Sequence, residues 1–323
     1  MGNSVSSLSK KILQHRGPKT QVHPDSYHVA FEEWESDGKQ PVSVTTVILV
    51  GAECAFRCTM CDLWKHTLDS ATPVGSLPKQ FAHAIGDRKA TDWIKLYNGS
   101  NFFDPRSVPR EDYGKLIELC RPYQRVVVEN HPRILPASIS EFANGLAGGL
   151  EIAMGLETIH PASMAILNKQ CTLDEFQRAC EWLLQQEISI RCFVLLQPPN
   201  TRSEESVEWA VRSTEFALKH GARHVSVIPT RGGNGIMEQL QVQGRFRPPT
   251  AWQLEETMEL ILGLRSHQVT TVDLWDWERL QGHCQRCSGP RQERLHRMSL
   301  EQRVIPYPEW SCDCSKGKGA IDA

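Results

Sequence analysis

Six apolar runs of strand length alternate with amphipathic stretches of helix length along most of this chain. The runs cover residues 44–50, 93–97, 125–129, 150–156, 189–196 and 224–228. Between them apolar residues recur at helical spacing, as at Leu173, Phe176 and Cys180 after a capping Thr172. Such alternation is typical of parallel strands joined by crossover helices. Six strands are more than a flavodoxin-like sheet needs and fewer than the eight of a closed barrel. The pattern therefore predicts an α/β fold with a partial (β/α)6 barrel.

Two stretches fall outside this alternation. Residues 1–41 carry Gly, Ser, Pro and balanced charge without sustained periodicity, which predicts a loosely structured lead-in. Residues 42–278 would form the barrel, with a last helix around 252–265 and a further strand that could lie at 269–274. The tail, 279–323, has eight Lys and Arg, five Asp and Glu, and four Cys. We therefore expect something other than a hydrophobic core to order the tail, as a small metal-bound C-terminal extension.

Composition excludes several classes of protein. The 36 Lys and Arg residues nearly balance the 38 Asp and Glu residues, so the net charge is −2 over 323 residues. A strongly basic nucleic-acid or membrane-surface binder is therefore not expected. No apolar stretch approaches the ~20 residues that cross a bilayer. The eleven cysteines, without the apolar core of a signal peptide, indicate metal-bound thiolates in a reducing compartment. We expect a cytoplasmic protein with no membrane partner.

Three cysteines, Cys54, Cys58 and Cys61, follow the first apolar run in a CxxxCxxC loop. Three thiolates at the end of a strand can face one 4Fe-4S cluster and leave its fourth iron without a protein ligand. An iron with an open position is a site for chemistry. Zinc fits less well, because a structural zinc usually has four protein ligands and only His66 lies near enough in sequence to be the fourth.

The CxxxCxxC loop, together with the barrel from about residue 42 to 264, resembles the radical S-adenosylmethionine (SAM) superfamily. The resemblance implies that SAM chelates the open iron. It implies that one electron from the cluster cleaves SAM to a 5′-deoxyadenosyl radical, which abstracts a hydrogen atom from a substrate. It also implies a reducing partner such as flavodoxin or ferredoxin. The class of substrate, a small molecule or an RNA base, is left open, because one core hosts many reactions.

Three segments are similar to the branch that contains the elongator-type and archaeosine-synthesis enzymes. They read Cys-Thr-Met-Cys-Asp-Leu-Trp, Leu-Tyr-Asn-Gly-Ser-Asn-Phe-Phe-Asp-Pro and Val-Val-Val-Glu-Asn-His-Pro. This similarity implies a base-modifying ancestry.

The resemblance also carries SAM-binding roles onto residues near the ends of the strands. Met60 occupies the family's aromatic position before the third cysteine, where a thioether can cover the adenine ring. Asn98, Gly99 and Ser100 stand where the family often has Gly-Gly-Glu for the methionyl ammonium. The other candidates for SAM binding are Glu129, Glu157, Lys169, for the SAM carboxylate, and Gln197, for the ribose. No catalytic residue can be assigned from the sequence.

A second group of cysteines lies in the tail as a CxxC pair and a CxC pair with 24 residues between them. Its members are Cys284, Cys287, Cys312 and Cys314. Four thiolates can surround one tetrahedral ion, and zinc would supply the folding energy that this segment lacks. An auxiliary 4Fe-4S cluster uses the same number of ligands, so a structural zinc and a second cluster both stay open. His283 and His296 are weaker candidates to replace one ligand.

Two other classes of function remain as alternatives. A non-catalytic zinc-binding interaction module would bind zinc at both cysteine groups and would not cleave SAM. An RNA-binding subunit of a base-modifying complex would contact phosphates through the arginines of the tail. These arginines are Arg286, Arg291, Arg294 and Arg297.

Overall fold

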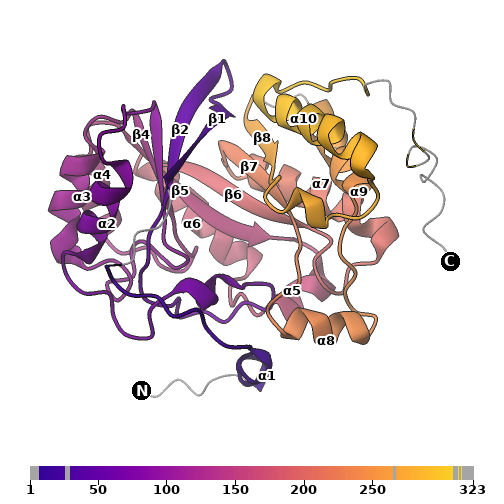
Figure 1. Ribbon diagram of the computed structural model, residues 1–323, viewed down its shortest axis with the longest axis horizontal. Coiled ribbons are helices and arrows are strands. Elements are labelled where there is room, and N and C mark those ends of the chain that lie inside the picture. Colours follow the sequence, from indigo (N-terminus) through magenta and orange to yellow (C-terminus); the bar gives the residue numbers. More distant parts are fainter. Residues whose placement is uncertain (1–6, 26–29, 265–266, 308–311, 313, 315–323) are drawn as a thin grey trace.

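Eight strands form one sheet whose order follows the sequence from β1 to β8 (Figure 1). The computed structural model describes residues 7–25, 30–264, 267–307, 312 and 314. The strands are β1 (Ala30–Ser36), β2 (Pro41–Ile48), β3 (Trp93–Tyr97), β4 (Arg125–Glu129), β5 (Gly149–Glu157), β6 (Ser189–Leu196), β7 (His224–Pro229) and β8 (Val269–Val272). β1 is antiparallel to β2, and β2 to β8 are parallel. Among the described residues no ladder joins β1 to β8, so the barrel stays open along one side.

The sheet confirms the predicted partial barrel, with seven parallel strands in place of six. The bounds of β3, β4 and β6 agree with the predicted runs, whereas β2, β5 and β7 differ by a few residues at their ends. The seventh parallel strand, β8, lies within the stretch 269–274, which the sequence marked as able to add a strand. All seven therefore present their carboxyl ends at one mouth, where the chemistry of such barrels is located.

The α-helices lie around the sheet, most of them along its outer side, whereas α1 and α8 lie below it (Figure 1). They are α1 (Ser7–His15), α2 (Ser76–Ile85), α3 (Tyr113–Cys120), α4 (Ser138–Gly145), α5 (Pro161–Leu167), α6 (Leu173–Gln185), α7 (Ser206–Lys219), α8 (Ile236–Val242), α9 (Ala251–Gly263) and α10 (Gln285–Glu301). α6 begins as predicted: the Thr172 hydroxyl accepts the Glu175 N–H at 3.2 Å, and the Glu175 carboxylate accepts the Thr172 N–H at 2.8 Å. The stripe formed by Phe176, Cys180 and Leu183 is buried.

Two segments predicted to lack regular structure contain it. Within residues 1–41, predicted as a loose lead-in, the structure has α1 and β1. The inward side chains of β1 include Glu33 and Glu35, so this strand shows no apolar alternation. The tail contains α10, whose buried face includes Arg291 and Arg294 and whose interior carries Pro290. Apolar periodicity cannot detect a helix that buries arginines.

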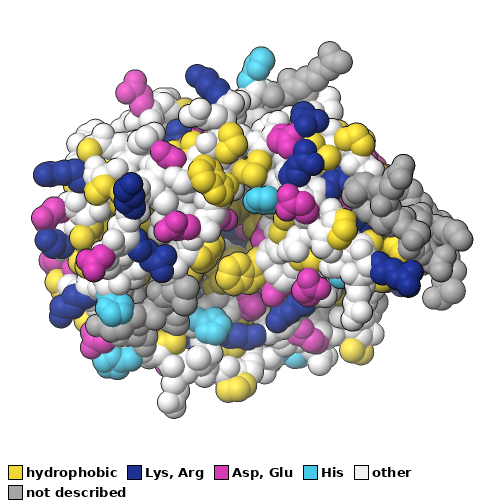
Figure 2. Space-filling view, turned by 45° about the horizontal axis from the view of Figure 1, so that its top comes forward, with side chains coloured by type: hydrophobic (Ala, Val, Ile, Leu, Met, Phe, Trp, Pro, Cys, Tyr) yellow, Lys and Arg dark blue, Asp and Glu magenta, His cyan; other side chains and the backbone are white. Residues whose placement is uncertain are grey.

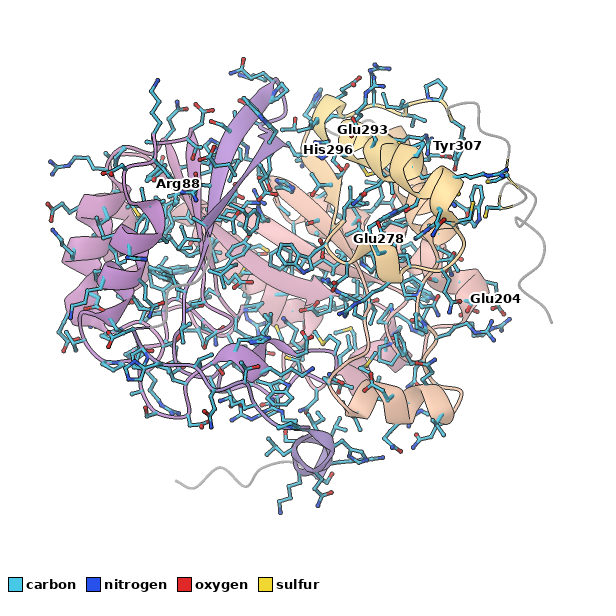
Figure 3. The ribbon with its side chains drawn as sticks, viewed as in Figure 1. Arg88, Glu204, Glu278, Glu293, His296 and Tyr307 are labelled. Atoms are coloured by element: carbon cyan, nitrogen blue, oxygen red, sulfur yellow. The ribbon has the colours of Figure 1, made fainter. Side chains whose placement is uncertain are left out.

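The interior of the barrel holds a network of ion pairs that joins strands on opposite sides. Arg191 of β6 binds Glu35 of β1 at 2.7 Å and Glu151 of β5 at 2.6 Å. Lys95 of β3 binds Glu33 at 2.7 Å and also pairs with Glu35. Side chains fill this interior (Figure 3). Because buried charges are stable only when they are paired, these contacts fix the position of β1 across the barrel from β6.

Candidate active site and metal centre

The CxxxCxxC loop follows β2 at the mouth of the barrel and is tied to the segments that enclose it. The Thr59 N–H donates to the Leu167 carbonyl at 2.9 Å, and the Thr59 hydroxyl donates to the Ile166 carbonyl at 2.5 Å. The side-chain amide of Asn234 donates to the carbonyl oxygens of Thr59, at 2.5 Å, and of Cys61, at 3.2 Å. A short loop with fixed backbone can hold three thiols in one arrangement.

The three thiols of this loop influence one another. Burial raises the pKa of the Cys58 and Cys61 thiols, that of Cys61 to about 12. Negative charge on Cys54 raises both pKa values further, while the Lys169 ammonium lowers that of Cys58. The Lys169 ammonium is thus the cation that acts on the Cys58 thiol. Their assignment as iron ligands stays a prediction.

Two residues that the sequence did not single out position Cys54. Asn101 donates from Nδ2 to the Cys54 sulfur at 3.2 Å, and its Oδ1 accepts the His131 N–H at 2.9 Å. The His131 ring stacks on Phe56, with ring centroids 3.6 Å apart and planes 10° apart. Both residues stand just after a strand end, in Asn-Gly-Ser-Asn and Glu-Asn-His-Pro. Their position after a strand end could have marked both residues as candidates for the site. The sequence alone does not show which polar side chain at a strand end points toward the cysteines.

Glu157 and Lys169, two of the predicted SAM-binding residues, form an ion pair of 2.6 Å. Glu157 ends β5 with a positive φ of 68°, where the pairing register with β6 shifts. A Cβ atom at Gly155 would lie within 3.0 Å of both charged groups, so only glycine leaves room for them. Burial opposes the charge of Lys169, but the Glu157 carboxylate raises the Lys169 pKa above its ordinary value. Lys169 therefore stays a cation next to Cys58.

Glu129, at the end of β4, faces the turn after β3. Burial raises the pKa of its carboxyl to about 7, although the N–H groups of Asn98 and Gly99 donate to it and lower that pKa. The Ser100 hydroxyl is buried without a hydrogen-bond partner among the described residues. A carboxyl group and an unpaired hydroxyl therefore lie around one turn, in keeping with a polar ligand that would complete their hydrogen bonds.

The remaining two SAM candidates are engaged elsewhere in the protein. Met60 packs against the cluster formed by Ile166, Met237, Leu240 and Phe246. The amide of Gln197 donates to the Thr201 carbonyl at 3.0 Å and accepts from Gln253 at 3.1 Å. Their contacts to adenine and ribose remain predictions, and the bonds of Gln197 hold its amide in the wall of the barrel.

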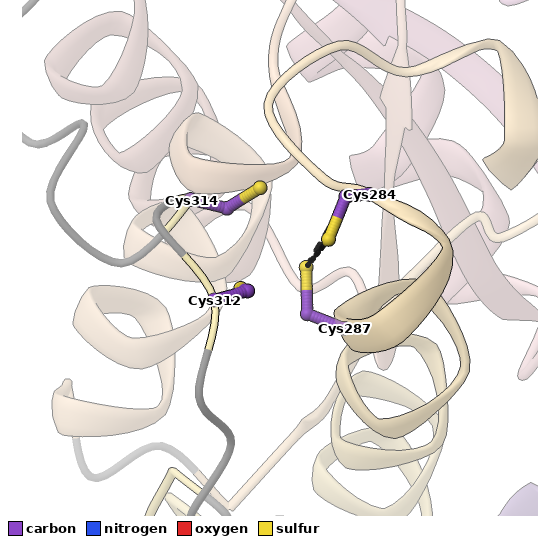
Figure 4. A group of neighbouring side chains, drawn as sticks. All are labelled: Cys284, Cys287, Cys312 and Cys314. Carbon is purple, nitrogen blue, oxygen red and sulfur yellow. Dashed lines mark hydrogen bonds between the residues drawn. The ribbon is translucent and has the colours of Figure 1, made fainter.

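The four cysteines of the tail come together at the start of α10 (Figure 4). The sulfur atoms of Cys284, Cys287, Cys312 and Cys314 all lie within 4.8 Å of one another. The predicted convergence is therefore present, and the group can hold a metal ion. His283 stacks instead on the Trp277 ring, with centroids 5.0 Å apart, and His296 does not belong to the group.

Three of the four arginines of the tail pair with carboxylates, whereas Arg286 is exposed. Arg291 and Arg294 are buried and bind Glu255 and Glu259, at 2.6 Å and 2.7 Å. Arg297 pairs with Glu301 at 2.9 Å. Acidic and basic side chains are interspersed on the face shown in Figure 2. Arg291 and Arg294 therefore serve the packing of α10, and RNA binding through the tail stays a prediction.

Comparison with known proteins identifies distant relatives. No family model matches the chain. It is 24% identical to archaeosine synthase subunit beta of Methanosarcina acetivorans over 96% of this chain and 94% of that protein. It is 22% identical to an uncharacterized protein of Methanocaldococcus jannaschii over 83% of this chain and 79% of that protein.

Within the described residues no helix is both long and apolar enough to cross a membrane.

A solved structure, that of methylornithine synthase, superimposes on nearly the whole chain. The TM-score is 0.53 and the sequence identity 13%, over 98% of this chain and 91% of that one. The predicted resemblance to radical SAM enzymes is thus confirmed at the level of the fold.

Proposed function

We propose that this chain, which has the fold of radical SAM enzymes, is itself an enzyme that reductively cleaves SAM at a 4Fe-4S cluster bound by Cys54, Cys58 and Cys61. The observation that carries the proposal is the CxxxCxxC loop, which the hydrogen bonds of Thr59 and Asn234 hold at the mouth of the barrel. The cluster, when bound with SAM, would supply a 5′-deoxyadenosyl radical that abstracts a hydrogen atom from the substrate.

The polar groups around the loop fit the two charged ends of a bound amino acid. Lys169 offers an ammonium for a carboxylate, and Glu157 keeps that ammonium charged and in place. Glu129 and the unpaired Ser100 hydroxyl offer oxygen atoms for an ammonium group. Opposite charges at separate places orient such a ligand in one direction, because the reversed orientation would bring like charges together.

Anaerobic reconstitution with iron and sulfide tests this function. We expect about four irons at the first site, with dithionite-dependent formation of 5′-deoxyadenosine from SAM. Cys58→Ala should abolish both the cluster and the product, whereas Cys180→Ala, a buried core cysteine, should keep them. Zinc without iron, and no 5′-deoxyadenosine, would instead support the non-catalytic interaction module.

The reducing partner and the substrate belong to the same proposal. A flavodoxin or ferredoxin would deliver the electron, and replacing dithionite with a reduced flavodoxin tests this.

Between a small molecule and an RNA base as the substrate, the similarity to archaeosine synthase subunit beta favours a base. Addition of transfer RNA should then increase hydrogen abstraction, measured as deuterium transfer from labelled RNA into 5′-deoxyadenosine. No transfer of deuterium from RNA would favour a small-molecule substrate instead.

The four cysteines of the tail would hold a second metal centre. A structural zinc ion and an auxiliary 4Fe-4S cluster both match a set of four thiolates. Either would stabilise the extension without touching the SAM site.

A further inference from the structure

We propose that Cys284, Cys287, Cys312 and Cys314 bind a single zinc ion, and that this ion latches α10 over the open side of the barrel. The inference goes beyond the proposed function, because the group lies outside the residues assigned to SAM and to the first cluster.

The spacing of the sulfur atoms suits one ion. Four thiolates at about 2.3 Å from a central zinc are about 3.8 Å apart in a tetrahedron. Cys284 and Cys287 have their sulfur atoms 3.8 Å apart, and all four lie within 4.8 Å of one another. In a 4Fe-4S cluster each thiolate binds a different iron, which sets the sulfur atoms farther apart, at about 6 Å. The observed group is too compact for a cluster.

The surroundings of the group favour thiolates. The Cys284 N–H donates to the Cys287 sulfur at 3.3 Å, and both residues stand at the positive end of the 17-residue helix α10. Arg291 places its guanidinium 4.0 Å from the same sulfur. Four thiolates around one divalent ion carry two net negative charges, which these groups partly offset. Arg291 holds this position because it also binds Glu255 through two nitrogens, at 3.0 Å and 2.6 Å.

The group joins two segments that lie far apart along the chain. Cys284 and Cys287 stand at the start of α10, whereas Cys312 and Cys314 come after residues 302–307, which return along the helix. That return is fixed by Arg294, which donates to the Ile305 carbonyl at 2.7 Å and lies over the Tyr307 ring at 3.8 Å. A metal bound at this place therefore links the start of α10 to the chain that follows the helix.

α10 occupies the place of a strand that would close the barrel. It packs against both edge strands, β8 and β1. Gln302, directly after the helix, accepts the Thr270 N–H at 2.9 Å and donates to the Thr270 carbonyl at 2.8 Å. Ser299 accepts the Val272 N–H at 3.4 Å. These side chains satisfy the edge of β8 as a neighbouring strand would, so α10 protects an edge that would otherwise be open.

Metal analysis separates this proposal from the radical SAM function. The full chain carrying Cys54→Ala, Cys58→Ala and Cys61→Ala lacks the first site, yet it should retain one zinc per chain and no iron. Cys314→Ser should lose the zinc, and Cys180→Ala should keep it. Cobalt substituted for zinc should give the absorption of a tetrahedral tetrathiolate. Iron and sulfide in the triple variant, or no metal in it, would overturn the zinc assignment.

Hydrogen exchange tests the latch. Removal of zinc by a chelator should speed the exchange of the Thr270 and Val272 amides roughly tenfold or more, with no change in β4 and β5. Gln302→Ala should raise exchange at Thr270 while the zinc stays bound, which separates loss of the edge contact from loss of the metal. Unchanged exchange in β8 after complete removal of zinc would refute the latch, even with zinc confirmed.

Discussion

Asn101 donates a hydrogen bond to the sulfur of Cys54, and the orientation of its amide is fixed by the protein. Because the backbone N–H of His131 can only donate, the oxygen of the Asn101 amide must face His131 and the nitrogen must face Cys54. The side chain is 4% exposed, so water does not replace either bond. A donor held against a sulfur withdraws electron density from it and stabilises the reduced form of a bound cluster.

Asn101→Ala should therefore lower the midpoint potential of the reconstituted cluster, by on the order of tens of millivolts. A redox titration followed by electron paramagnetic resonance measures this shift. Asn200→Ala, which removes an exposed amide bonded to the Ala162 carbonyl, serves as the control. An unchanged potential in a variant with full iron content would show that the hydrogen bond does not tune the cluster.

Gly155→Ala should disrupt the pair formed by Glu157 and Lys169, because the new methyl group would lie within 3.0 Å of both charged groups. We expect SAM binding to weaken at least about tenfold and stability to fall by about 1–3 kcal/mol. Calorimetry and urea unfolding measure these effects. Gly114→Ala is the matched control, since no atom lies within 4 Å of its added Cβ. Equal behaviour of the two variants would contradict the steric argument.

The stability of the cluster-free protein should depend on Glu129 between pH 4.5 and 7. The pKa of its carboxyl rises from an ordinary 4.5 to about 7 in the folded protein. In this window the folded state keeps a proton that the unfolded state has lost, so rising pH destabilises the fold. Relative to Glu129→Gln, the wild type should lose about 1–3 kcal/mol on going from pH 4.5 to pH 8. Urea titrations at several pH values measure the difference, and a constant gap between the two proteins would refute the shift.

Arg191→Met should destabilise the protein by about 3–5 kcal/mol, because it leaves the buried carboxylates of Glu35 and Glu151 without their common partner. Burial opposes the charge of Glu35, but Arg191 and Lys95 hold the Glu35 pKa well below its ordinary value. Arg212→Met, at an exposed pair with Glu208, should cost less than about 1 kcal/mol. Urea unfolding measures the stability of both variants. Comparable losses would show that the interior ion pairs contribute no more to stability than the exposed pair.

Much of the barrel and the first cysteine group was predictable because both are local patterns. The parallel strands of the core are mostly apolar, which marks β3, β4 and β6 by sequence alone even though Lys95 interrupts β3 and Arg191 interrupts β6. The CxxxCxxC spacing limits the distance between its thiols whatever the rest of the chain does. The glutamates at the ends of β4 and β5 followed from the strands, since a residue that directly follows a buried run must lie near the mouth of the barrel.

Other features depend on contacts between distant segments. β1 and α10 bury charged residues whose partners lie on other elements. A search for periodic apolar residues therefore does not detect this strand and this helix. The amide of Gln197 is taken by Gln253, which is remote in sequence, and the orientation of Asn101 depends on His131.

What the sequence alone determined is thus the order of the parallel core strands and of the helices between them, and which cysteines group together along the chain. The tertiary structure decided which polar groups are paired, how the open side of the barrel is covered, and how compact the second cysteine group is. The physical reason is that periodicity and spacing constrain neighbours along the chain, whereas the pairing of a buried charge or thiol depends on where distant segments meet.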